Sequence, residues 1–400
     1  MWQSLVASDY TPKKELLQRI NGLKEKMAEA GIGFSVIMQN ADLFYFSGTI
    51  QKGVMVVPAD GDPFLFVERS LERVHAETPL DITPIKRDKE IGAILQQKGI
   101  LKGKGGMELD VVPVSVFERF KALVGFEEFV DVTPLVRELR IVKSPFEIEQ
   151  IKRSGRIISR IFEKAKHVVR EGIREIDIDA ELVAEGRRYG HQGFLRMRGF
   201  NQEMMNIYVT AGATSGIPSN ADVPISGLGL TAAIAQGSSL KPVERGVPVL
   251  VDYGGGYNGY VTDETRVYVA GDMKERFKKA YEVTKEIVED VTSFGREGID
   301  CTEIFNRTYQ LVKKAQLQDH FMGFGEGQVS FVGHGLGLEI NELPVITSRH
   351  SRVLKEGMVF AFEPKFIFPG EGSVGIEVDF IARKQGLERV VDFPIDAVYV

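Results

Sequence analysis

The chain has 400 residues, of which 43% are hydrophobic and 26% are charged. These proportions are typical of a folded globular protein, exclude disordered and collagen-like chains, and together with the length predict two domains. The 50 basic and 56 acidic side chains leave a formal net charge of -6. The chain therefore lacks the overall positive charge that would predict nucleic acid or an anionic membrane as a partner.

The cysteine content and the N-terminal residues indicate where the protein works. The single cysteine, Cys301, excludes an intramolecular disulfide and a zinc site made of several cysteines. Residues 1–20 lack the basic and apolar regions of an export signal, and the sequence has no uninterrupted apolar run of ~18 residues that predicts a membrane span. We therefore expect a cytoplasmic protein.

The first part of the chain alternates helical and strand-like patterns. Residues 11–30 carry apolar side chains at steps of three and four, which predict an amphipathic helix. An apolar run follows at 34–38, and two more at 53–58 and 63–68 flank a turn, as in a β-hairpin. Further helix-like and strand-like stretches alternate near 70–77, 89–98, 105–109, 114–124 and 128–132. We predict an α/β domain over residues 1–143.

A second domain is predicted over residues 144–400. Ser144-Pro145-Phe146-Glu147 has an N-cap serine, a proline in the first turn and a glutamate three residues on, which together predict a helix start. The tetrapeptide Arg-Glu-Gly-Ile occurs at 170–173 and again at 296–299, each time between two helical patterns. This repeat predicts two similar α/β halves, whose strands could form one shared sheet.

Four carboxylates and one histidine stand in strand-like contexts of the second domain. Asp252 ends an apolar run, and Asp263 follows it across a glycine-rich turn, so a hairpin would bring the two together. His334 lies between two glycines, and Glu363 and Glu377 adjoin apolar runs. Each residue alone is explained by a turn, a cap or a structural role. If they converge, divalent metal is the simplest explanation, because four buried carboxylates repel one another and can neutralise two dications.

In order and spacing these five residues resemble the ligand motifs of the aminopeptidase P, prolidase and methionine aminopeptidase family. The resemblance covers roughly residues 145–400. The smaller first domain resembles the creatinase and prolidase N-terminal domain. The resemblance implies an α/β (α+β) fold with a creatinase-like N-terminal domain and a C-terminal pita-bread domain with pseudo-twofold symmetry.

The same resemblance implies a dinuclear metal site. It makes Asp252 a ligand of one ion, makes His334 and Glu363 ligands of the other, and places Asp263 and Glu377 as bridges. A metal-bridging water would be the nucleophile, with Glu363 as general base. Members of the family use manganese, cobalt, zinc or iron, of which the carboxylate-rich set favours manganese. They commonly form homodimers.

The sequence departs from the family pattern near the site. Asn341 stands where the active peptidases have a second histidine, and Ser219 is the best match to a further substrate-side histidine. Asn341 could donate a hydrogen bond but cannot titrate. An arginine that usually precedes the last ligand by two residues is Gly375 here. Arg196 and Arg198 alternate in a stretch, 194–203, that is interpreted as a strand, where they could hold a substrate carboxylate or could lie on a solvated face.

From these residues we expect a dinuclear metal-dependent hydrolase, a metallopeptidase of the Xaa-Pro dipeptidase or aminopeptidase type, that acts on a peptide or a small amide. One alternative is a non-peptidase hydrolase or lyase that acts on a small carboxylated metabolite with the same scaffold. Another is a metal-binding relative without catalysis, although such relatives typically lose metal ligands and this chain keeps all five.

Overall fold

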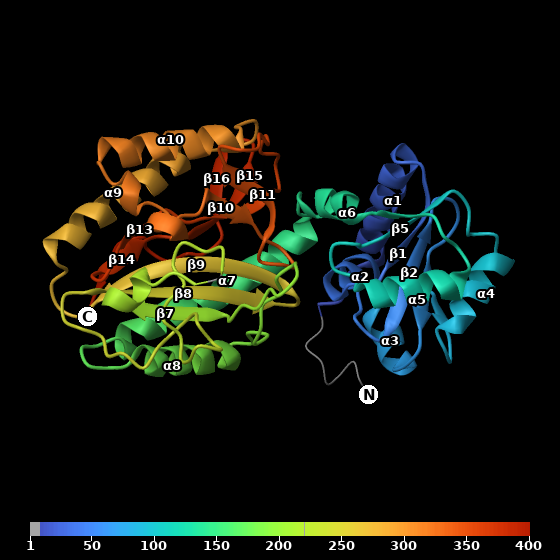
Figure 1. The fold of residues 1–400 in the computed structure, drawn as a ribbon, viewed down its shortest axis with the longest axis horizontal. Coiled ribbons are helices and arrows are strands. Elements are labelled where there is room, and N and C mark those ends of the chain that lie inside the picture. Colours follow the sequence, from blue (N-terminus) through green and yellow to red (C-terminus); the bar gives the residue numbers. More distant parts are fainter. Residues whose placement is uncertain (1–8, 220) are drawn as a thin grey trace. The chain divides into compact units, whose positions relative to one another are not determined.

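The computed structural model describes residues 9–219 and 221–400 (Figure 1). Residues 1–8, part of the stretch searched for an export signal, lie outside this description. The chain divides into two compact units: the residues up to Arg140 together with Arg198–Gln202, and Ile141–Met197 together with Glu203–Val400. The domain boundary between residues 143 and 144 stays a prediction. Within the described ranges, no helix combines the length and the apolar character that a membrane crossing requires.

The first unit is built on one six-stranded sheet with the strand order β4-β3-β2-β1-β5-β6. The antiparallel pair of β2 and β3 confirms the predicted hairpin. Helix α1 buries Leu16, Ile20, Leu23 and Met27 along one side, as its amphipathic pattern predicts. The strands are β1 (Ile32–Ile37), β2 (Gly53–Pro58), β3 (Phe64–Val67), β4 (Ile82–Pro84), β5 (Lys104–Met107) and β6 (Phe129–Asp131). The helices are α1 (Lys13–Glu29), α2 (Asn40–Ser47), α3 (Leu71–Glu77), α4 (Lys89–Gln97), α5 (Val114–Val124) and α6 (Thr133–Arg140).

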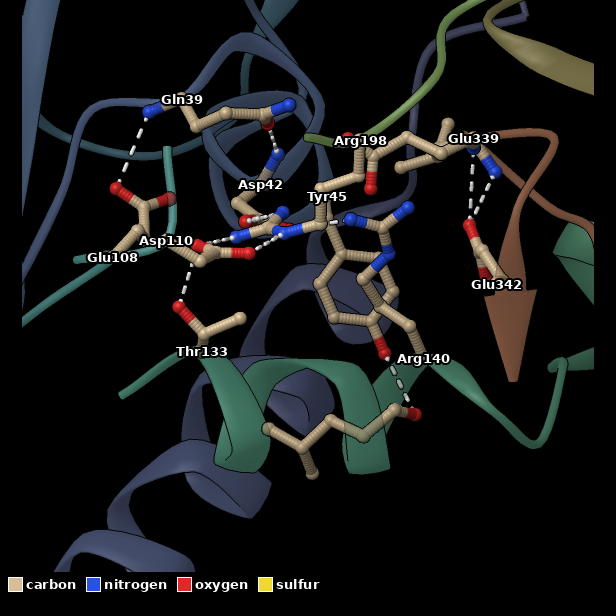
Figure 2. Close-up of polar contacts among 12 residues, drawn as sticks. Gln39, Asp42, Tyr45, Glu108, Asp110, Thr133, Arg140, Arg198, Glu339 and Glu342 are labelled. Atoms are coloured by element: carbon tan, nitrogen blue, oxygen red, sulfur yellow. Dashed lines mark hydrogen bonds and ion pairs between the residues drawn. The ribbon is translucent and has the colours of Figure 1, made fainter. Parts of the chain in front are cut away.

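The segment Arg198–Gln202 is far along the chain but packs with the first unit. The Arg198 guanidinium lies 2.8 Å from Asp42 and 2.6 Å from Asp110, and Arg140 pairs with the other oxygen of Asp42 at 2.6 Å (Figure 2). The prediction of a strand over 194–203 is wrong, because the segment is irregular. Gly199 and Asn201 have φ values of 131° and 53°, which interrupt an extended backbone.

The second unit consists of two halves, each a helix pair followed by strands. The two Arg-Glu-Gly-Ile segments join α7 to α8 and α9 to α10, which confirms the predicted helix pairs. Helix α8 lies on one side of the strands of this unit, and α9 and α10 lie on the other (Figure 1). The helices are α7 (Pro145–Val168), α8 (Glu175–Arg188), α9 (Glu275–Phe294) and α10 (Cys301–Lys314). The strands of the first half are β7 (Ile207–Ala211), β8 (Pro248–Tyr257) and β9 (Tyr260–Val269).

Apart from the C-terminal strand β17, which pairs with β9, the strands of the two halves form separate sheets, so the one shared sheet suggested by the sequence is wrong. The sheets have the orders β17-β9-β8-β7, β11-β10-β12-β15-β16 and β13-β14. A buried side chain joins the first two sheets, because Asp379 of β15 accepts the backbone N–H of Asp263 of β9 at 2.8 Å. The remaining strands are β10 (Phe331–Gly335), β11 (Glu342–Thr347), β12 (Val359–Phe362), β13 (Lys365–Phe368), β14 (Gly372–Gly375), β15 (Val378–Arg383), β16 (Gly386–Arg389) and β17 (Val398–Tyr399).

The hairpin of β8 and β9 is buried on both faces and separates two cores. Leu250 and Val267 pack into the core formed with α9 and α10, whereas Val251 and Tyr268 pack into the core formed with α7 and α8. Side chains alternate along a strand, so Asp252, which lies two residues after Leu250, shares the face of Leu250. Asp263 and Thr265 share this face with Val267. The alternation therefore turns both aspartates toward the second half.

His191 is a buried titratable group in the second unit. Its Nδ1 accepts the N–H of Gly193 and its Nε2 donates to the carbonyl of Gly254, each at 3.0 Å. Its ring meets the Tyr253 ring edge-on. Burial lowers the pKa of His191 to about 4, because the charged imidazolium would lose its hydration.

We expect His191 to make the second unit less stable in mild acid. The unfolded histidine, with a pKa of about 6.5, binds a proton between about pH 6.5 and pH 4 while the folded one does not, so stability falls as the pH falls through this window. The free energy of unfolding should drop by about 2 kcal/mol from pH 7 to pH 5 through this group alone. Urea titrations of the His191→Gln variant should lose this part of the pH dependence, whereas the exposed-site control His350→Gln should keep it. An unchanged pH profile in His191→Gln would contradict the assignment.

Candidate metal centre

Two of the predicted ligands come from the β8–β9 hairpin. Thr265 is the cross-strand partner of Asp252, and Gly254 is the partner of Asp263. The hydrogen bond between the Asp263 N–H and Asp379 fixes the backbone at the second aspartate. The side-chain Oδ1 of Asp263 is buried and has no hydrogen-bond partner. A buried carboxylate oxygen in this state requires a cation or a donor.

His334 lies on β10 between two strands of the five-stranded sheet. Its Nε2 is 3.9 Å from Asp263 Oδ2 and 3.7 Å from Glu363 Oε1. The preceding glycine permits this position, because a Cβ on Gly333 would lie 2.3 Å from the carbonyl oxygen of Ala361 on β12. The close approach of two backbones thus explains the glycine that precedes the predicted ligand.

The two glutamates stand where strands of the second half end or begin. Glu363 directly follows β12, and its N–H donates to the carbonyl of Val332 at 2.9 Å. Glu377 lies between β14 and β15. Asp263, His334 and Glu377 each offer one ligand atom, and these atoms lie within 4.8 Å of one another. The structure therefore brings predicted ligands from both halves into one place.

Thr265 and Arg266 support Glu377 from β9. The Thr265 hydroxyl donates to Glu377 Oε2 at 2.8 Å, and the Arg266 guanidinium donates to the Glu377 carbonyl at 2.7 Å. Arg266 also pairs with Glu264 at 2.8 Å, with both side chains fully buried. Hydrogen bonds of this kind fix the orientation of a ligand carboxylate. The sequence analysis assigned no role to either residue, although both directly follow Asp263-Glu264.

Lys365 was missed by the sequence analysis and lies inside the ligand set. Its ammonium nitrogen is 3.1 Å from Asp252 Oδ2, 3.0 Å from Glu363 Oε2 and 2.8 Å from Glu377 Oε2. The side chain is 3% exposed. The available signal was a lysine that follows Glu363-Pro364 and opens an apolar strand, Lys365-Phe366-Ile367-Phe368. A lysine in such a strand requires a buried partner.

The charges of this site shift one another's pKa values. Burial raises the pKa of Asp252, and Lys365 opposes that rise. Burial, together with the charges of Glu377 and Asp252, holds the pKa of Asp263 well above its ordinary range. Burial alone would lower the pKa of Lys365, but Asp252, Glu377 and Glu363 outweigh it and raise that pKa well above the usual value. The ammonium is therefore charged at neutral pH.

Tyr208 on β7 is a further residue beside the aspartates that the sequence analysis missed. It is the cross-strand partner of Asp252. Burial raises the pKa of its hydroxyl, and the charges of Asp252 and Asp263 raise it further. The hydroxyl donates to Gln236 Oε1 at 3.0 Å. Tyr208 therefore remains a neutral hydrogen-bond donor on the strand next to Asp252.

Asn341 was predicted as a catalytic residue, and Ser219, Arg196 and Arg198 were predicted to bind substrate. Asn341 directly precedes β11, which pairs with the His334 strand β10. Ser219 lines a cavity of about 190 Å³ together with Ile367, which follows Lys365 by two residues on β13. The Arg196 guanidinium lies over the Phe194 ring at 5.1 Å, and its carbonyl accepts the N–H of Ile340 at 2.8 Å. Arg198 is paired with Asp42 and Asp110, so a substrate carboxylate would compete with two pairs already formed.

Comparison with known proteins identifies the family. The pattern of metallopeptidase family M24 matches residues 149–384, which is more than half of the chain. The chain belongs to metallopeptidase family M24. The creatinase/prolidase N-terminal domain pattern matches residues 19–142 of this M24 protein.

Individual relatives match the M24 chain over nearly its whole length. The Xaa-Pro dipeptidase of Pyrococcus furiosus is 28% identical over 375 residues, which are 93% of this chain and 97% of the relative. The solved structure of an Xaa-Pro dipeptidase from Bacillus anthracis has a TM-score of 0.83 and 25% identity, covering 96% of this chain and 100% of that one. The X-Pro aminopeptidase structure from Thermotoga maritima, at 24% identity and a TM-score of 0.78, covers 95% of this chain and 99% of that one and shows the same fold.

These findings confirm three predictions from the sequence. The chain is a member of the prolidase and aminopeptidase P group of M24 proteins. Its fold is a creatinase-like N-terminal domain with an M24 pita-bread domain. It is a metallopeptidase-like hydrolase of a family that uses divalent metal ions.

We expect Thr265→Val to weaken the binding of a divalent ion to this M24 site. The variant removes the hydroxyl that holds Glu377, and loss of such a supporting hydrogen bond typically costs ~10- to 100-fold in metal affinity. Titration calorimetry with Mn²⁺ measures the change. Thr262→Val is the matched control, because Thr262 is a buried threonine of the same strand whose hydroxyl contacts Ser154 instead. Equal affinities for Thr265→Val and the wild-type protein would contradict this role.

Proposed function

We propose that this M24 protein is a metal-dependent Xaa-Pro dipeptidase. The observation that carries the proposal is the convergence of Asp263 on β9, His334 on β10 and Glu377 between β14 and β15 onto one place. The similarity to proteins named Xaa-Pro dipeptidase extends over nearly the full chain and supports the substrate class. A peptide substrate is consistent with these relatives.

The donor set fits a divalent ion. Two carboxylates and one imidazole suit manganese and other borderline or hard cations, and the unpaired Oδ1 of Asp263 offers a further ligand atom. We propose manganese as the ion, with Asp263, His334, Glu363 and Glu377 as the residues that would hold it. When bound, such an ion polarises a carbonyl group and lowers the pKa of a water molecule.

The side chains around the ligands supply the remaining functions. We propose that Glu363 accepts the proton of the attacking water, because its Oε1 faces His334 at 3.7 Å while Lys365 occupies its Oε2. Asn341 would donate a hydrogen bond to the substrate oxygen that becomes negative, without titrating. The cavity lined by Ser219 would take the prolyl ring, because its wall is mostly apolar and its volume is about 190 Å³. Arg196 would hold the substrate carboxylate.

A second candidate is hydrolysis or lysis of a small carboxylated metabolite. Asn341 and Ser219, which stand where histidines are expected, favour it, because their side chains cannot transfer protons as an imidazole does. The homodimer and the cytoplasmic location stay predictions.

We expect the Mn²⁺-loaded protein to cleave Xaa-Pro dipeptides and to leave Xaa-Pro tripeptides and non-proline dipeptides intact. Glu363→Ala should lower kcat by at least ~10³-fold, because it removes both a ligand and the proton acceptor. Glu326→Ala replaces an exposed glutamate and should not change kcat. Chromatography of the released amino acids measures cleavage of each peptide by the wild-type protein and the two variants.

The Asn341→His variant separates the two candidate functions. If the peptidase function is correct, wild-type protein cleaves the dipeptides and the variant gains at most a modest factor. Cleavage that begins only in Asn341→His would reject the dipeptidase proposal and favour a small carboxylated metabolite as the substrate.

A further inference from the structure

The Lys365 ammonium occupies a position among the ligands that a cation would take. It contacts three carboxylates, those of Asp252, Glu363 and Glu377, at 2.8 to 3.1 Å. These are distances of charge-assisted hydrogen bonds. The resemblance assigns all three as metal ligands: Asp252 to one ion, Glu363 to the other and Glu377 to both. The lysine therefore takes oxygens from two ligands of the Asp252 ion, Asp252 and Glu377, and one oxygen of Glu363.

The backbone opposite Lys365 is adapted to this side chain. Gly375 on β14 is its cross-strand partner on β13. A Cβ on Gly375 would lie 2.4 Å from Cγ of Lys365 and 3.0 Å from its Cβ. A side chain at position 375 and the observed path of Lys365 exclude one another. Lys365 on this path therefore requires glycine at position 375, where the family pattern has arginine.

A divalent ion does not fit beside this ammonium. An ion bound to Asp252 Oδ2 and Glu377 Oε2 would share both oxygens with Nζ, and two positive charges that share ligand atoms repel strongly in a buried site. The lysine side chain is 3% exposed and bonds three carboxylates, so moving it away would break three charge-assisted hydrogen bonds. On the opposite side of the site, Asp263 Oδ1 has no partner and His334 is nearby. An ion bound by Asp263, His334 and Glu377, whose ligand atoms lie within 4.8 Å of one another, would need no oxygen of Asp252.

We propose that Lys365 takes the place of one of the two ions of the family, so that this chain binds a single divalent ion between Asp263, His334 and Glu377. The ammonium then neutralises Asp252 and orients Glu363 and Glu377 permanently. This inference rests on the proposed function only in that both require an ion at Asp263. The proposed site holds one divalent ion instead of the two expected from the sequence. The Lys365 ammonium supplies the positive charge in place of the second ion.

Metal content tests the proposal directly. Full-length protein is stripped with a chelator and dialysed against excess Mn²⁺, and bound metal is counted by mass spectrometry. We expect about one Mn²⁺ per wild-type chain and about two per Lys365→Ala chain, because the alanine variant frees the Asp252 oxygens. The electron paramagnetic resonance spectrum should change from that of an isolated Mn²⁺ ion to that of an exchange-coupled pair.

Lys143→Ala is the matched control. Lys143 is also a buried lysine of the second unit, and it pairs with Glu342 at 3.1 Å, a carboxylate outside the ligand set. This variant should retain one ion, so a general loosening of the unit cannot account for a second ion in Lys365→Ala. Circular dichroism confirms that both variants fold.

The wild-type count decides the question even where Lys365→Ala does not fold. Two ions in the wild-type protein, or none, would overturn the proposal, as would a folded Lys365→Ala chain that still binds one. Failure of the proposed function gives a different result: one ion per wild-type chain without cleavage of Xaa-Pro dipeptides.

Discussion

Buried negative charge is the constraint on which the second unit depends. Asp252, Asp263, Glu363 and Glu377 leave water together, and uncompensated carboxylates in such a place cost several kcal/mol each. Hydrogen-bond donors and cations from both halves offset this free-energy cost: Thr265 on β9, Lys365 on β13 and His334 on β10. The strands that end at this point therefore hold the two halves together through polar contacts, whereas the two apolar cores lie on opposite faces of the β8–β9 hairpin.

A cation that is part of the chain has properties that a bound ion lacks. It cannot dissociate, and its affinity does not vary with the metal supply. The carboxylates that contact Lys365 are oriented before any ion arrives, which reduces the ordering that metal binding would otherwise require. An ammonium is nevertheless a weaker polarising group than a divalent ion, because its single charge is spread over three hydrogen-bond donors. The arrangement therefore keeps the carboxylates stably oriented, but it polarises a bound group less strongly than two divalent ions would.

Much of the fold and the ligand set could be predicted because local patterns carry them. The alternation of side chains along β8 and β9 puts Asp252 and Asp263 on the same face of the hairpin. The glycines around His334 indicate that another strand approaches the backbone closely there. The sequence shows Lys365 in an apolar strand but not its partners, because Asp252, Glu363 and Glu377 come from segments that converge only in the folded chain. Arg198 is a similar case, because its partners Asp110 and Asp42 lie 88 and 156 residues away. Ion pairs at such separations leave no periodic signal.

The insertion of Arg198–Gln202 into the first unit has a consequence for how the protein is made. During synthesis the chain emerges from its N-terminus, and domains commonly fold as they appear. The first unit, however, cannot complete its buried Asp42 pair until residue 198 has left the ribosome, well after helices α7 and α8 of the other unit. Until then Asp42 has Arg140 as its ion-pair partner. Completion of the N-terminal unit is thus coupled to translation of Ile141–Met197, the first segment of the second unit.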